Sequence, residues 1–168
     1  MIRTNYCARI LCATATCALL LSLSDSALAA QATATVSATV LQPVTLTKTS
    51  DLEFGKIVAG PSASTVTMTS GGQFRCGTGI TCLDTHNMAR FSVNGIPGQL
   101  VSVQLDNQIV LSSAGGVKMP VALEASATSM KLGSSPNNVI SVGGTLSVAA
   151  YQAEGIYTGL FTITVNYN

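Results

Sequence analysis

The chain has 168 residues, of which 9% are charged and 5% are aromatic, and its formal net charge is +1. Nucleic-acid binding needs a basic stripe of Lys and Arg against the phosphates, so we expect no nucleic-acid partner. From residue 30 onward the charges balance, with six basic and six acidic side chains. Residues 30–168 are enough for a single domain with its own core.

The first 29 residues are interpreted as a secretory signal peptide. Two arginines supply a positive start, residues 10–23 are mostly apolar, and small residues at 27 and 29 give a cleavage pattern. A retained membrane anchor is the alternative, which an aspartate and three serines in the run disfavour. We expect export through the inner membrane into the periplasm, and then to the cell surface or outside the cell. No later apolar run reaches spanning length.

Three of the five cysteines lie in this leader, which leaves Cys76 and Cys82. An exported pair this close in sequence indicates a disulfide. The loop that it closes is short, so the expected gain in stability is roughly 2 kcal/mol. A redox pair and a zinc site are the alternatives, but the first favours a CxxC spacing and the second needs more ligands.

Period-two alternation of apolar and polar residues predicts strands along the rest of the chain. The first strand alternates from Ala32 to Val40, is broken by Pro43 and resumes over residues 44–47. Residues 70–87 are polar and Gly-rich, which indicates a long loop or hairpin tip. We expect residues 100–105 to form a strand that pairs back onto a strand at residues 89–94. The full set of further expected strands lies at residues 52–57, 64–69, 89–94, 100–105, 109–111, 117–127, 139–142, 145–151 and 157–168.

About eight short strands with frequent turns predict an all-β, antiparallel sandwich or barrel. One helical turn over residues 122–131 is the alternative to strand there. The glycine pairs at 71–72, 115–116 and 143–144 are interpreted as turns, because they lack the strand–glycine–helix context of a phosphate cradle.

The end of the chain is the clearest strand. Phe161, Ile163, Val165 and Tyr167 alternate with polar residues, so one face should be buried and the other wet. Because no later segment follows in this sequence, we expect an earlier segment or a partner to cover the apolar face and the open edge. This pattern favours assembly over catalysis.

Catalytic and metal-binding patterns are weak. His86 is the only histidine, and a triad with Ser92 and Asp84 lacks a nucleophile-elbow motif. Asp51 with Glu53, and Asp84 with Asn87, lack the regular spacing of calcium ligands. We therefore expect no enzyme, no cofactor and no metal.

Four ordered pieces resemble the bacterial family called domain of unknown function 4402. They are Leu52-Glu53-Phe54-Gly55, Phe91-Ser92-Val93-Asn94-Gly95-Ile96-Pro97, Val142-Gly143-Gly144-Thr145-Leu146, and Gly155-Ile156-Tyr157-Thr158-Gly159 running into Val165-Asn166-Tyr167.

That family in turn resembles spore-coat-U-type and chaperone–usher pilin subunits. The resemblance implies an incomplete immunoglobulin-like β-sandwich, whose missing strand comes from the N-terminal extension of a neighbour. It also places a Tyr second from the end and a Gly fourteenth from the end, as Tyr167 and Gly155 are here. Pilins of this kind commonly carry a cysteine late in the first strand, where this chain has Pro43. If residues 38–46 form that strand, only residues 30–37 remain as a donor.

The resulting hypothesis is a structural subunit of a bacterial surface fibre or coat, assembled by β-strand complementation. Phe161, Ile163, Val165 and Tyr167 would form the assembly face, and Ala32, Ala34 and Val36 would be donated. The expected partners are copies of itself or related subunits, with a periplasmic chaperone and usher. The alternative is a self-complete secreted binding module, adhesin-like, that recognises glycan or protein through residues 70–87. Residues 31–37 discriminate between the two: unpaired, they favour assembly.

Overall fold

The computed structural model describes residues 30–134 and 138–168, so the predicted signal peptide lies outside the described residues. Residues 39–168 form one compact unit, while residues 30–38 are all exposed and belong to no strand. The described residues contain no helix able to span a membrane. Their twelve strands are β1 Thr45–Ser50, β2 Lys56–Val58, β3 Ser64–Met68, β4 Phe74–Cys76, β5 Thr81–Leu83, β6 Ala89–Asn94, β7 Leu100–Leu105, β8 Gln108–Ser112, β9 Lys118–Ala125, β10 Ser129–Lys131, β11 Val139–Val148 and β12 Ile163–Tyr167.

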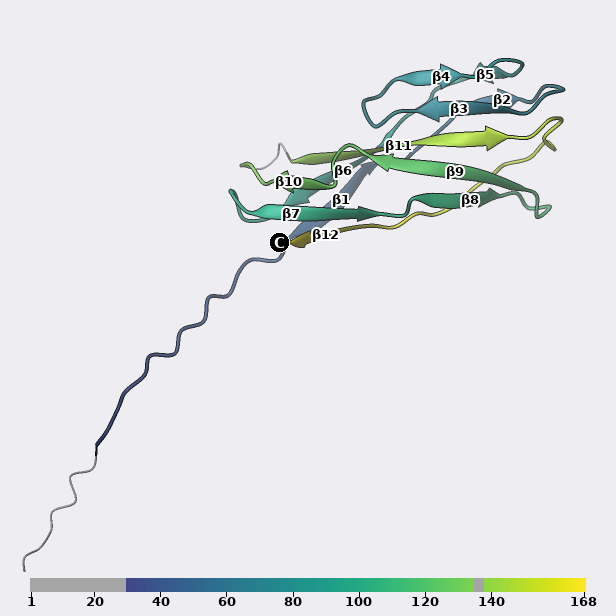
Figure 1. Ribbon diagram of the computed structural model, residues 1–168. Helices are drawn as coiled ribbons and strands as arrows, with labels where there is room; N and C mark the ends of the chain where they lie inside the picture. The colour runs from purple at the N-terminus through teal and green to yellow at the C-terminus, as the bar shows by residue number, and fades with distance from the viewer. Residues whose placement is uncertain (1–29, 135–137) are drawn as a thin grey trace, which may run out of the picture. The chain divides into compact units, whose positions relative to one another are not determined.

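The strands form a larger and a smaller antiparallel sheet and one short ribbon (Figure 1). In the larger sheet, β1 pairs with β6, β6 with β11, β11 with β3 and β9, β3 with β4, and β9 with β8. The smaller sheet has the order β10-β7-β12, and β2 pairs with β5 in the ribbon. The predicted all-β, antiparallel sandwich is therefore confirmed.

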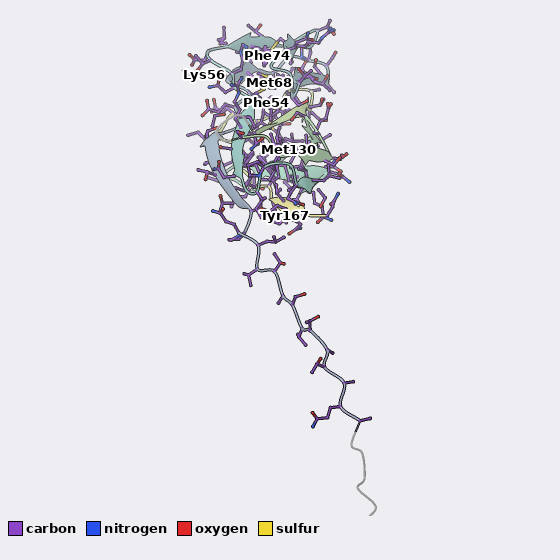
Figure 2. All side chains as sticks on the ribbon, turned by 90° about the vertical axis from the view of Figure 1, so that its left-hand side faces the viewer. Phe54, Lys56, Met68, Phe74, Met130 and Tyr167 are labelled. Atoms are coloured by element: carbon purple, nitrogen blue, oxygen red, sulfur yellow. A yellow bond between two sulfur atoms is a disulfide. The ribbon has the colours of Figure 1, made fainter. Side chains whose placement is uncertain are left out.

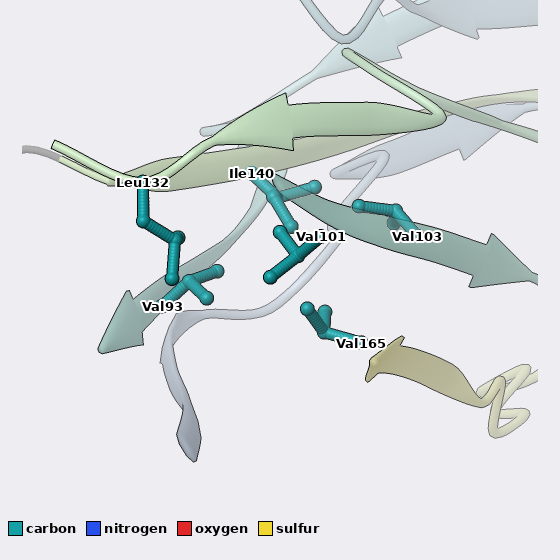
Figure 3. Packing of buried hydrophobic residues seen from close by; sticks show 6 residues of the cluster. All are labelled: Val93, Val101, Val103, Leu132, Ile140 and Val165. Carbon is teal, nitrogen blue, oxygen red and sulfur yellow. The ribbon is translucent and has the colours of Figure 1, made fainter. Parts of the chain in front are cut away.

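The core lies between the two sheets. Along β6, Ala89, Phe91 and Val93 are buried while the residues between them are not, and β7 buries Val101 and Val103 in the same way. Figure 3 shows side chains from β6, β7, β11 and β12 converging on one interior. This cluster, here called the lower core, consists of Val93, Val101, Val103, Leu132, Ile140 and Val165.

Strand β7 does not pair back onto β6, contrary to the sequence-based expectation. Its partners are β10 and β12, in the smaller sheet. The turn at residues 95–98, in which Gly98 has φ +86°, carries the chain from one sheet to the other. Two strands joined by a short turn are expected to pair in the same sheet, but a sandwich needs some connections to cross between its layers.

Residues 139–148 form one strand, so the interpretation of Gly143-Gly144 as a turn is wrong. Both glycines lie inside β11, which pairs with β6, β3 and β9 along its length. A Cβ on Gly143 would collide with the Met68 carbonyl oxygen, and one on Gly144 would lie 3.0 Å from the Ala122 carbonyl oxygen. These glycines permit close approach of neighbouring backbones, whereas residues 71–72 and 115–116 do lie in turns.

Residues 70–87 are more ordered than a loop. They contain β4, which pairs with β3, and β5, which pairs with β2 instead of β4. The strand expected over residues 52–57 is shifted, because Glu53 forms an isolated bridge with Asn87 and β2 begins at Lys56. Residues 122–131 hold two strand segments joined by a bend, and no helical turn. Strands of three residues carry too little alternation to be predicted reliably.

The strand expected from Ala32 to Val40 is absent, and β1 begins at Thr45. Alternation shows that a segment suits a half-buried strand, but a strand also needs a neighbour to pair with. No described residue of the chain pairs with this segment. As a consequence the unpaired stretch before β1 is longer than expected from the sequence.

Candidate assembly site at the open edge of the last strand

The inward face of β12 is built by the alternation in its sequence. Val165 is only 8% exposed, and Phe161, Ile163 and Tyr167 are half-buried. The residues between them, Thr162, Thr164 and Asn166, are exposed. The four residues proposed for an assembly face therefore point inward, although Phe161 lies before the strand begins at Ile163.

One edge of β12 is unpaired. Thr162 accepts a hydrogen bond from the Asp106 amide (3.2 Å), and the Asn168 amide donates to Leu100 (3.1 Å). Hydrogen-bonding groups alternate between the two edges of a strand, so the backbone groups of Ile163, Val165 and Tyr167 point away from β7. Within the described chain, β7 is the only strand that pairs with β12. An edge of this kind can accept another strand.

Strand β1 presents a second unpaired edge. In the part of the chain described, it pairs only with β6. Val44, Leu46, Ile163 and Tyr167 are all half-buried and pack against the lower core. The unpaired edges of β1 and β12 flank the lower core, and we call the line between these two edges the open seam. A strand added there would complete the cover over four partly exposed apolar side chains.

Tyr167 stands at one end of the open seam. Its hydroxyl oxygen accepts a hydrogen bond from the Ile96 amide (2.9 Å), and its hydroxyl donates to the Gln42 carbonyl oxygen (3.1 Å). Figure 2 places Tyr167 at one end of the compact unit and Phe74 toward the other. The sequence singled out Tyr167 by its position but gave no sign of its partners, because each partner is a backbone group.

The N-terminal segment supplies apolar side chains without a partner. Its alternating residues include Ala32, Ala34 and Val36, and the described structure leaves all of them exposed. Val36 is 97% exposed and Val40 is 95% exposed. Valine side chains are usually buried in a folded protein. The segment therefore has the residue pattern of a strand but pairs with no sheet in the described structure.

Cys76 and Cys82 form a disulfide, with their sulfur atoms 1.99 Å apart and their Cα atoms 6.0 Å apart. Cys76 ends β4 and Cys82 lies within β5, so the bond ties the larger sheet to the β2–β5 ribbon. It lies at the Phe74 end of the unit and contributes nothing to the open seam.

The residues considered for catalysis have other partners. The His86 ring stacks on Phe74 with centroids 3.8 Å apart, and Asp84 forms an ion pair with Lys56 at 2.7 Å. The hydrogen bond from Lys56, and then its charge, lowers the pKa of Asp84. Ser92 lies in β6 opposite Thr47 and Val139. Among the described residues, no three His, Cys, Asp or Glu side chains are grouped to hold a metal ion.

Fold and seam together define an antiparallel β-sandwich whose last strand has an open edge. The chain belongs to the family described as "Domain of unknown function (DUF4402)", whose model matches residues 44–167. This is the family that the sequence motifs resemble, and its match starts at Val44, directly before β1. No curated protein and no solved structure gave a significant match.

Proposed function

We propose that the protein is a structural subunit of a bacterial surface fibre or coat, assembled when the N-terminal segment of one copy adds as a strand to the open seam of another. The observation that carries this proposal is that one chain has both an open sheet edge and a strand-like segment without a partner strand. The seam has two unpaired strand edges beside half-buried apolar side chains that pack against the lower core, and residues 32–40 alternate like a strand but belong to none.

The chemistry of the two surfaces is complementary. Addition of a strand to β12 would satisfy the outward backbone groups of Ile163, Val165 and Tyr167. Alternate residues of the segment would face the lower core, and small side chains such as Ala32 and Ala34 suit a narrow space between two sheets. Burial of Val36 and Val40 would add about 1.5–3 kcal/mol each.

The length of the segment also supports the proposal. Because β1 starts at Thr45, residues 30–43 are free of the sandwich ladder. This removes the difficulty that residues 30–37 alone would be a short donor. We propose that the partner is another copy or a related subunit, that the protein is exported, and that a periplasmic chaperone and usher protect the open edge before assembly.

A peptide of residues 30–43 tests the proposal directly. Added to the purified exported protein as the monomer, it should bind and protect the Ile163, Val165 and Tyr167 amides from hydrogen exchange. The same peptide with Val36→Asp should bind much more weakly, because a carboxylate would enter an apolar space. Equal binding of both peptides, or none, contradicts strand addition and leaves the self-complete binding module in its place.

A further inference from the structure

Tyr167 links the two unpaired edges of the open seam. It belongs to β12, while Gln42, which accepts its hydrogen bond at 3.1 Å, comes three residues before β1. The phenol thus connects β12 to the residues just before β1, at one end of the open seam where an added strand would lie. A strand lying between the edges meets this side chain as it approaches that end.

The same phenol occupies the place where the β1–β6 ladder stops. Thr45 pairs with Asn94, so two more residues of the same register would set Pro43 opposite Ile96. Proline has no amide hydrogen to give to that pair. The Ile96 amide donates to the Tyr167 oxygen instead, at 2.9 Å. Pro43 and Tyr167 therefore end the ladder together, and the chain before them leaves the sheet.

The position of the phenol is fixed by its surroundings. The ring packs against the lower core. A Cβ on Gly95 would lie 2.5 Å from the Tyr167 hydroxyl oxygen and 2.8 Å from Leu132 Cδ1, so the missing side chain makes room for both. Two hydrogen bonds and this packing hold the ring in one place.

We propose that Tyr167 is a positioning residue that sets the register in which the N-terminal segment of a second copy adds to β12. The proposal rests on the assembly function above. A strand can slip by two residues without turning its apolar side chains to the other face, so the long alternation from Ala32 to Val40 does not select one register. A fixed side chain at the end of the open seam selects one register, because the added strand cannot move past it.

Disulfide trapping between two copies tests this register. The acceptor carries Thr164→Cys, which faces outward on β12. Four donors each carry one cysteine in the matching polar set, at Thr33, Thr35, Ser37 or Thr39. After mixing and mild oxidation, mass spectrometry identifies the crosslinked position. With Tyr167 present, one donor position should dominate; with Tyr167→Phe in the acceptor, crosslinks should spread to positions two residues away.

Tyr157→Phe in the acceptor is the matched control. The Tyr157 hydroxyl also makes two hydrogen bonds, accepting from Gln152 Nε2 (2.9 Å) and donating to the Ala153 carbonyl (2.7 Å), so the chemical change is the same. This variant should keep one dominant position. One dominant position in the Tyr167→Phe acceptor, or spread crosslinks already with Tyr167, overturns the register proposal. No crosslink to any donor with Tyr167 present overturns the assembly function itself.

Discussion

Gly143 of β11 lies so close to the end of β3 that a Cβ on it would collide with the carbonyl oxygen of Met68. The neighbouring backbone of Thr69 and Ser70 crowds the same point. Both β3 and β6 pair with β11, and Gly143 stands between the two pairings. The glycine is therefore needed for contact between strands and not for a turn.

Gly143→Ala should destabilise the protein by about 1–3 kcal/mol or more, because backbone atoms cannot move aside as a flexible side chain can. Gly115→Ala is the control, since a Cβ there would meet only Ser113 Oγ at 3.8 Å. Urea unfolding of both variants checks the prediction. Equal midpoints would show that β3 is not packed against Gly143 as described.

Loss of the disulfide should have a local effect. Cys76→Ser with Cys82→Ser should cost roughly 2 kcal/mol of unfolding free energy, because the closed loop is short. The bond joins β4 to β5, so hydrogen exchange should speed up in β2 and β5 while β6 and β11 stay protected. Loss of all β-sheet circular dichroism at room temperature would contradict this assignment. Two free thiols in the purified, unreduced protein would contradict the bond itself.

A charge on the inward face of β12 should destabilise the protein, whereas a charge on its outward face should be tolerated. Val165→Asp places a carboxylate in the lower core, where Val165 is 8% exposed, and should cost on the order of 3 kcal/mol or more. Thr164→Asp faces water and should change stability by about 0.5 kcal/mol or less. Thermal unfolding of the two variants decides. Similar melting temperatures would contradict the facing of β12 described here.

The ion pair of Lys56 and Asp84 gives a pH-dependent prediction. The hydrogen bond and charge of Lys56 lower the pKa of Asp84, so this contribution to stability is present above the ordinary Asp pKa of 3.8 and is lost as pH falls through the lowered value. The pKa of Lys56 is raised by the same hydrogen bond and charge, so its contribution is present below 10.5 and is lost as pH rises through the raised value.

Asp84→Asn should therefore lower the melting temperature slightly at neutral pH and not at strongly acidic pH. The effect is small because the pair is exposed. Asparagine tolerates the left-handed backbone of residue 84, whose φ is +72°, so no added strain confuses the comparison. Melting curves of wild type and variant at several pH values check it. A difference that grows toward acid would show that the sign is wrong.

Strand position was easier to predict from the sequence than strand partnership. The limits of β6 and β7 match the expected residues 89–94 and 100–105, because alternation with buried valines marks a strand locally. Their placement in different sheets depends on contacts far along the chain. The N-terminal alternation likewise marked a strand that the single chain does not form, because alternation records a suitable surface and not the presence of a neighbour.

The candidate site was predicted in part for the same reason. The inward set of β12 follows from period two, whereas Val44 and Leu46 on the other side of the seam were assigned only to a resumed first strand. The bonds from Tyr167 to Gln42 and Ile96 involve backbone atoms distant in sequence. Residue type carries no signal for such bonds, so only the folded chain reveals them.

Assembly of the purified protein with a charge in the N-terminal segment tests the central claim most directly. Val36 is 97% exposed and Ser37 is exposed as well, so Val36→Asp and Ser37→Asp should leave the monomer folded. Period two puts these neighbours on opposite faces of an added strand. In native electrophoresis, wild type and Ser37→Asp should form higher oligomers and Val36→Asp should stay monomeric. Oligomers of all three proteins alike, or a wild type that remains a monomer, would contradict strand complementation.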